Sequence, residues 1–121
     1  MRQQHPIWWS RQSTPPPAPW LYAFEEFTNG ETVQHWGEAS AFLILEAKRK
    51  TRQWPTWAEL FVDLFPSTCG LPSLLPDSIP LNKQYRARSE FRFHTLNAWR
   101  RAGWITWGND RYRSLQPQRR R

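Results

Sequence analysis

The feature that most constrains the fold is a change of period within residues 89–115. In the first half of this stretch, apolar side chains recur at every third position, as on one face of a helix, at Phe93, Leu96, Trp99 and Ala102. Gly103 follows, where a helix is expected to end. Residues 104–107 and 111–115 contain aromatic, β-branched and Arg residues, and the Gly-Asn-Asp between them tolerates positive φ angles. The stretch therefore predicts a helix with Ser89 as its N-cap, followed by a β-hairpin with a basic second strand.

Two further helices are expected before this stretch. Over residues 31–50 apolar side chains keep a three- or four-residue spacing, with Glu31 in the first turn and Lys-Arg-Lys in the last, as the helix dipole prefers. In the second helix, Thr56 is the predicted N-cap and Glu59 completes a capping box, until a proline ends the helix. The apolar segment 20–27 fits either a short helix or a strap over the core.

The length and composition fit one small domain. The chain has 121 residues, of which 39% are hydrophobic, and its nine Trp indicate an aromatic core. We expect an N-terminal tail over residues 1–19, because this segment is poor in aliphatic residues and ends in a proline run. The domain then covers residues 20–115, with a Pro-rich insertion at 66–85, and a basic tail over 116–121 ends the sequence.

The N-terminal tail contains an unusual apolar cluster, Ile7, Trp8 and Trp9. A disordered segment gains nothing from exposing two indoles to water unless they dock on a surface. They are therefore expected to bind a partner, a second copy of the chain or this domain itself, and the sequence does not choose among these.

The charge of the chain is divided unevenly. Residues 1–47 contain two Arg and five Glu, a net of −3, whereas residues 48–121 contain fifteen Lys or Arg and five Asp or Glu, a net of +10. A basic segment of this kind attracts polyanions, and nucleic acid is the commonest polyanion in a cell. A solvated basic face and contact with an acidic protein remain alternatives.

Several other functional classes have little support in the sequence. A single cysteine, Cys69, excludes an internal disulfide, and His5, His35 and His94 are dispersed without metal-ligand spacing. No glycine-rich phosphate loop is present, so we expect neither an enzyme nor a cofactor. No apolar run approaches the roughly 20 residues that cross a bilayer, and the N-terminus lacks a signal-peptide core. We expect a cytoplasmic protein that does not associate with membranes.

The predicted order of three helices and a hairpin resembles the winged helix-turn-helix domain over residues 31–115. In the bacterial form of that domain, the recognition helix ends in a pattern that is matched here by Leu96, Trp99, Gly103, Trp104 and Ile105. Residues 54–60 are similar to the start of the family's second helix. The chain departs from the family in the long insertion between its second and third helices. The resemblance implies a mainly helical α+β fold with a winged-helix-like three-helix core and a C-terminal β-hairpin wing.

The resemblance also implies a nucleic-acid interface on the face of the third helix opposite its core stripe. A helical wheel places Glu90, His94, Asn97 and Arg101 on that face, with Arg100 at its margin. Arg111 and Arg113 alternate on the predicted wing, and Trp107 near its tip is expected to be exposed and able to stack on a base. The candidate nucleic-acid-binding residues are Arg86, Arg88, Arg92, His94, Asn97, Arg100, Arg101, Arg111 and Arg113.

The function that these observations favour is non-catalytic binding of double-stranded DNA by a small transcription regulator or replication accessory. The alternative from another class is a structural or adaptor subunit of a larger protein or ribonucleoprotein assembly. In that case the N-terminal Trp tail and the insertion would make the protein contacts. RNA binding is a third possibility.

Overall fold

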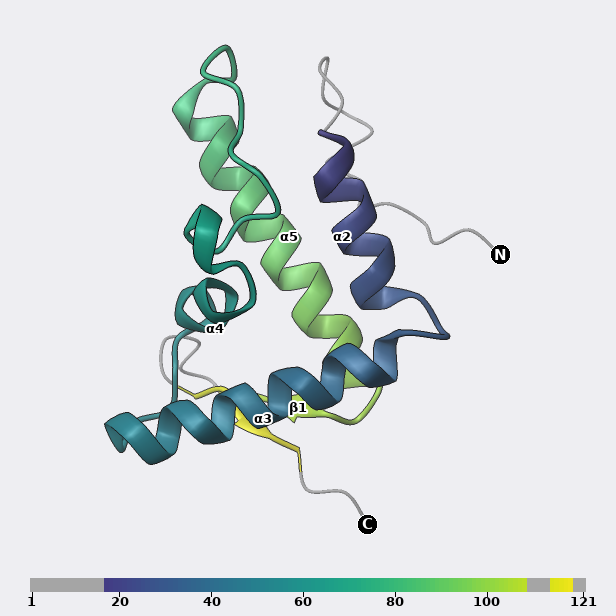
Figure 1. Cartoon of the computed structure of the whole chain (residues 1–121), viewed down its shortest axis with the longest axis vertical. Helices are drawn as coiled ribbons and strands as arrows, with labels where there is room; N and C mark the ends of the chain where they lie inside the picture. Colours follow the sequence, from purple (N-terminus) through teal and green to yellow (C-terminus); the bar gives the residue numbers. More distant parts are fainter. Residues whose placement is uncertain (1–16, 109–113, 119–121) are drawn as a thin grey trace.

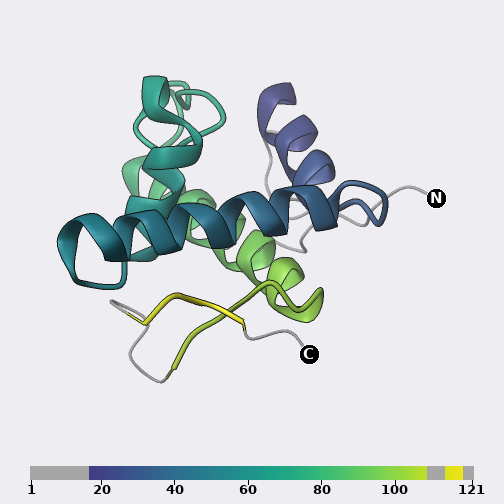
Figure 2. The same ribbon diagram turned by 60° about the horizontal axis from the view of Figure 1, so that its bottom comes forward.

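The computed structural model describes residues 17–108 and 114–118 of the chain. Within them the elements are α2 (Ala18–Thr28), α3 (Val33–Thr51), α4 (Trp57–Leu64), the 3-10 helix η1 (Pro66–Thr68), α5 (Leu81–Arg101), β1 (Ile105–Thr106) and β2 (Gln116–Pro117). Figure 1 shows α2 beside α5, α4 on the other side of α5, and α3 crossing below them. The two short strands lie against α3 (Figure 2). The expected mainly helical α+β class is confirmed.

Aromatic rings fill the core where α2, α4 and α5 meet. The fully buried Trp99 of α5 stacks on Phe61 of α4, with ring centroids 6.2 Å apart and planes 13° apart. Its indole N–H donates to the backbone oxygen of Phe27 in α2 at 2.9 Å. Phe91, about two turns earlier on α5, contacts Trp20 of α2 at a centroid distance of 5.3 Å. Each such ring contributes roughly 1.5–3 kcal/mol when fully buried, so this cluster determines how the three helices pack.

Helix α2 begins earlier than the predicted boundary of the domain. Residues 20–27, for which a helix and a strap were both possible, belong to helix α2, which begins at Ala18 rather than after residue 19. Prolines suit the first turn of a helix, because their missing N–H has no partner there, and this α2 has proline in its first turn. The indole N–H of Trp20 donates to the backbone oxygen of Ser73 at 3.1 Å, which ties the Pro-rich connection to α2.

The predicted start of the third helix at Ser89 is wrong. Helix α5 begins at Leu81, directly after Pro80, whose φ of −55° is already helical. The residues between Leu81 and Ser89 are mostly good helix formers, so no N-cap is needed at Ser89. The Pro-rich connection therefore ends at residue 80 rather than 85. The longer helix also changes its core stripe, because Phe91 is buried while Phe93, predicted in the core, is half-buried.

The ends of α3 follow the prediction in part. Glu31 precedes the helix, so the predicted acidic residue in its first turn is wrong, and Thr32 is the N-cap. The three basic residues do lie in the last turn, where they interact favourably with the helix dipole. The chain then leaves the helix through Arg52, which adopts a left-handed φ of 63°.

The capping box of α4 is confirmed. The backbone N–H of Glu59 donates to Oγ1 of Thr56 at 3.0 Å, and the backbone N–H of Thr56 donates to Oε1 of Glu59 at 2.8 Å. The helix ends at Leu64, one residue before the Phe65 that precedes Pro66, because the residue before a proline is disfavoured in helical geometry. Leu60 and Phe61 are buried, as the predicted apolar stripe requires.

The hairpin has a different register from the predicted one. Ile105 pairs with Pro117 and Thr106 with Gln116, so the described second strand lies just after Leu115, where the predicted strand ends. Leu115, directly before the second strand, is fully buried in the core. The predicted basic tail over 116–121 therefore begins with a strand. Residues 109–113 of the predicted turn and second strand lie outside the described residues.

Gly37 allows the start of the hairpin to approach α3. A Cβ atom at this position would lie 2.7 Å from Cγ of Trp104, inside van der Waals contact. The indole N–H of Trp104 donates to Oε1 of Gln34, one turn earlier on α3. Glycine inside a helix lowers the stability of that helix. At position 37 it is nevertheless required, because any larger residue would clash with Trp104. No helix in the described part of the chain is both long enough and apolar enough to cross a membrane.

Gly37→Ala is expected to destabilise the protein by up to about 2 kcal/mol. Overpacking against Trp104 costs roughly 1–3 kcal/mol, which exceeds the gain of about 1 kcal/mol in helix propensity. Urea unfolding followed by circular dichroism measures the difference. Gly30→Ala is the control, because a Cβ there meets no atom within 4 Å and should leave stability nearly unchanged. A stabilising Gly37→Ala would contradict the close approach.

Thr56→Ala and Ser89→Ala distinguish the observed helix starts from the predicted ones. Removing the Thr56 cap is expected to cost about 1 kcal/mol. Ser89 lies inside α5, so Ser89→Ala should be neutral or stabilising by up to about 0.5 kcal/mol, as alanine favours helix. The free energies of unfolding come from the same urea titrations. A loss of similar size in both variants would mean that Ser89 caps a shorter helix.

Candidate nucleic-acid interface

The polar side chains of α5 form a ridge along one side of the helix. Its members recur at three- and four-residue spacing, as neighbours on one helix face do. Arg86 and Arg101 are exposed at its ends, and Glu90, His94 and Asn97 between them are half-buried. The core residues of α5 lie on the other side of the helix. The structure thus brings the four residues of the predicted outward face together, and the earlier helix start adds Arg86 to them.

Within the ridge, His94 is held by Glu90. The imidazole Nε2 lies 3.0 Å from Oε2 of Glu90, one helical turn away, and about a third of each side chain is exposed. The carboxylate orients the imidazole and removes part of the positive charge at the middle of the ridge. The two arginines at its ends have no ion-pair partner among the described residues.

Arg88 and Arg92 do not belong to this ridge. They lie one turn apart on a flank of α5 that turns toward the core, and the Nε atom of each is buried without a hydrogen-bond partner. Burial lowers the pKa of Arg92, and the positive charge of Arg88 lowers it further. Arginine nevertheless stays protonated at neutral pH. Two neighbouring guanidinium groups without a carboxylate partner in the described part of the chain form a site suited to an anion.

Arg92 also lines a pocket of about 540 Å³ between the start of α4 and the middle of α5. The other lining residues are Trp57, Ser89, Glu90, Phe93 and His94. The rings of Trp57 and Phe93 are 6.3 Å apart between centroids. Aromatic rings next to a guanidinium are the groups that bind a base and its phosphate together. The sequence placed Phe93 on the core face of the helix. The signal that was missed is Phe91, which is buried in its place and leaves Phe93 half-buried at the edge of the core.

A second cation–aromatic contact joins α5 to the hairpin. The guanidinium carbon of Arg100 lies 4.3 Å from the ring centroid of Trp107. Trp107 in turn meets Trp57 of α4 edge to face, with centroids 5.2 Å apart. The expectation that Trp107 is exposed at the wing tip is therefore wrong, because it is half-buried between α4 and Arg100. The contact places Arg100 at the junction of helix and wing.

Some predicted site residues cannot be placed. Arg111 and Arg113 of the wing and the partner-binding residues Ile7, Trp8 and Trp9 lie outside the described residues. Among the residues that are described, no group of three or more His, Cys, Asp or Glu side chains is arranged to hold a metal ion. The only cysteine of the chain, Cys69, is exposed.

Comparison with known protein families, with curated proteins and with solved structures found no match to this chain.

Arg92→Met is expected to raise the free energy of unfolding by about 1 kcal/mol. The substitution keeps the unbranched stem but removes a buried Nε without a partner and the repulsion from Arg88, and an unsatisfied buried donor costs roughly 1–3 kcal/mol. Arg86→Met is the matched control, because Arg86 is exposed and should change stability by less than about 0.5 kcal/mol. Urea unfolding at low salt measures both. A destabilising Arg92→Met would show that the guanidinium has a partner within the protein.

Proposed function

We propose that this protein binds double-stranded DNA without catalysis, with α5 facing the major groove and the β1–β2 segment acting as a wing. The observation on which the proposal rests is the uncompensated charge of α5. This helix contains six Lys or Arg residues and one Glu, a net of +5. The one Glu contacts His94, and none of the arginines of α5 forms an ion pair within the described residues. A helix of this kind lowers its electrostatic energy by binding phosphates.

The arrangement of elements supports a winged-helix-like interpretation. Three helices, α3, α4 and α5, are followed by a short antiparallel sheet that packs against α3. The connection between α4 and α5 is longer than in the winged helix-turn-helix domains that the sequence resembles. Figure 1 shows this connection beside the N-terminal half of α5. The C-terminal half, which includes Asn97 and Arg101, therefore extends beyond the connection toward the hairpin.

Different side chains would take different parts in binding. Asn97 and Arg101 lie on the outward ridge and have the groups that pair with adenine and guanine edges. Arg92 lines the aromatic pocket and Arg88 lies one turn away on the same flank, where a phosphate would neutralise both guanidinium groups. Arg100 is held by Trp107 and would contact the backbone at the junction with the wing. Sequence discrimination would thus come from the ridge, and affinity from the flank and the junction.

An adaptor function remains the second candidate, and exposed apolar side chains favour it. Tyr22, Phe42 and Leu74 are each more than half exposed, on α2, α3 and the Pro-rich connection. Exposed apolar side chains mark a protein–protein contact where they form a contiguous patch. The two functions are compatible, because these residues lie on elements other than α5.

The DNA-binding proposal predicts strongly salt-dependent binding to a random duplex. Titration by fluorescence anisotropy should give a negative log–log slope equivalent to several phosphates. Arg101→Ala is expected to reduce the slope by about 1. Arg49→Ala is the matched control, because this exposed arginine lies on α3 and already pairs with Glu46 at 3.0 Å; its affinity and slope should match the parent.

Three results would contradict the proposal. Absence of binding at low salt would exclude nucleic acid as the ligand. Equal losses in the Arg101 and Arg49 variants would show that attraction is diffuse and does not involve α5. Tighter binding to single-stranded or double-stranded RNA than to DNA of the same sequence would move the function to the RNA alternative.

A further inference from the structure

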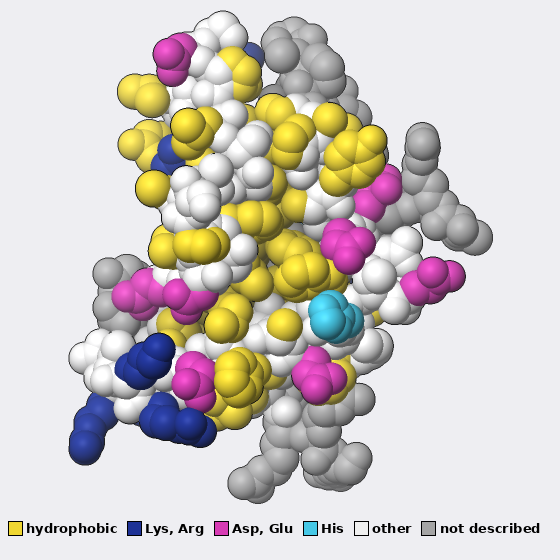
Figure 3. Space-filling view, viewed as in Figure 1, with side chains coloured by type: hydrophobic (Ala, Val, Ile, Leu, Met, Phe, Trp, Pro, Cys, Tyr) yellow, Lys and Arg dark blue, Asp and Glu magenta, His cyan; other side chains and the backbone are white. Residues whose placement is uncertain are grey.

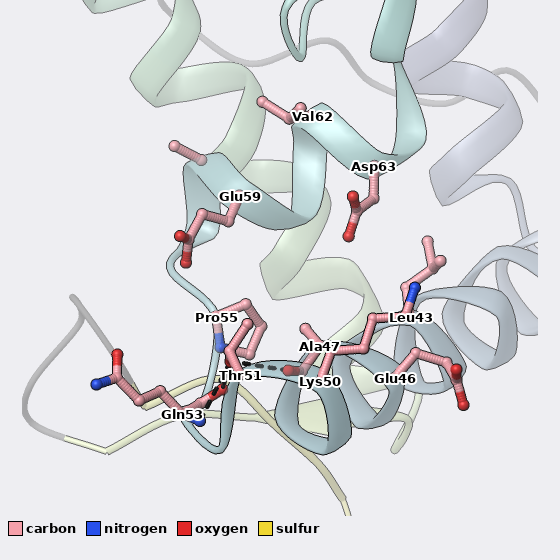
Figure 4. Close-up of a pocket in the computed structure, with 11 residues that line it drawn as sticks. Leu43, Glu46, Ala47, Lys50, Thr51, Gln53, Pro55, Glu59, Val62 and Asp63 are labelled. Atoms are coloured by element: carbon pink, nitrogen blue, oxygen red, sulfur yellow. Dashed lines mark hydrogen bonds between the residues drawn. The ribbon is translucent and has the colours of Figure 1, made fainter.

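A second surface, distinct from α5, lies between α3 and α4. The two helices form the walls of an open groove of about 660 Å³, which Figure 4 shows from the side. Leu43 and Ala47 line it from α3, Val62 and Asp63 line it from α4 with Asp63 pointing toward α3, and the segment that joins the helices closes one end. Pockets of roughly 300–1,000 Å³ with apolar walls are the usual size of sites that hold ring-containing ligands.

The rim of this groove is acidic, although the chain as a whole is basic. Glu46, Glu59 and Asp63 line it, against one lysine. Glu46 pairs with Arg49 and Glu59 accepts the N–H of Thr56, whereas Asp63 has no hydrogen-bond or ion-pair partner in the described part of the chain. Figure 3 shows acidic side chains beside apolar ones over this region, with basic side chains gathered at the end of α3. The groove is thus suited to an apolar segment with a flanking positive charge.

The chain itself contains a segment with this chemistry. Residues 2–11 have the sequence RQQHPIWWSR, with three large apolar residues between two arginines and no acidic residue. This segment is otherwise unexplained, since the proposed DNA interface makes no use of it. We propose that the groove between α3 and α4 binds this N-terminal segment, with the indoles against the aliphatic walls and an arginine beside Asp63.

The inference is independent of the DNA-binding proposal. The groove is formed by α3 and α4, and none of its lining residues belongs to α5. Bulky aromatic residues in a desolvated pocket dominate the energy of many interfaces, so the two indoles would provide most of the affinity. The arginine beside Asp63 would orient the bound segment and raise its association rate more than it would raise the affinity.

Site-specific photocrosslinking in the full chain tests the proposal. A p-benzoylphenylalanine residue replaces Val62, which lines the groove and is 43% exposed. After irradiation, peptide mapping is expected to find the cross-link within residues 2–11. The matched control places the same group at Tyr22, which is 74% exposed on α2 and does not line the groove. A mixture of ¹⁴N- and ¹⁵N-labelled chains shows whether the segment comes from the same chain or from a second copy.

Two variants make the test specific. Trp8→Ala combined with Trp9→Ala should lower the cross-link yield at position 62 by more than about fivefold, because it removes the anchoring rings. Asp63→Lys should lower the yield and leave the thermal midpoint nearly unchanged, because Asp63 is exposed. Cross-links from position 62 to another segment, no cross-links, or yields unchanged by the Trp substitutions would overturn the proposal. A similar yield at position 22 would also overturn it.

Discussion

The rest of the structure depends on the burial of the Trp99 indole. This one side chain contacts α2 through its hydrogen bond to the Phe27 carbonyl and α4 through its stacking on Phe61. Its own backbone oxygen accepts the N–H of Trp104 at 3.1 Å, where the chain leaves α5 for the hairpin. An indole is large enough to reach several elements, and its N–H demands a partner when buried. Trp99 therefore determines both the rotation of α5 about its axis and the direction in which the wing begins.

That rotation places the charged side chains of α5. With Trp99 and Phe91 in the core, the ridge that ends in Arg101 faces outward, and Arg88 and Arg92 fall on a flank where water reaches them poorly. Desolvated guanidinium groups without carboxylate partners reduce stability, and proteins commonly accept such a loss where binding requires it. The cation–aromatic contact of Arg100 with Trp107 and the edge-to-face contact of Trp107 with Trp57 then join the wing to α4. The same packing thus produces the hydrophobic core and a concentrated positive field next to it.

The elements that the sequence predicted well are those specified by neighbouring residues. The capping box of Thr56 and Glu59, the basic last turn of α3 and the stop at Pro66 all involve groups within a few residues of one another. The predictions failed where distant residues decide. The core stripe of α5 follows from contacts with α2, such as that of Phe91 with Trp20, and the strand pairing of Ile105 with Pro117 lies beyond the buried Leu115.

Some features of the candidate site could likewise be predicted from the sequence, and others depend on the tertiary structure. The outward ridge of α5 could be predicted from helical spacing alone, since residues three and four apart share a face in any helix. By itself, the sequence therefore determined the mainly helical class, the helices α3 and α4, and the concentration of positive charge in the later part of the chain. Only the tertiary structure decided that Arg88 and Arg92 are half-hidden beside an aromatic pocket, that Trp107 is covered by Arg100, and that an acidic groove separates α3 from α4. These features depend on which faces of different helices meet. Side-chain packing between segments far apart in the chain decides which faces those are.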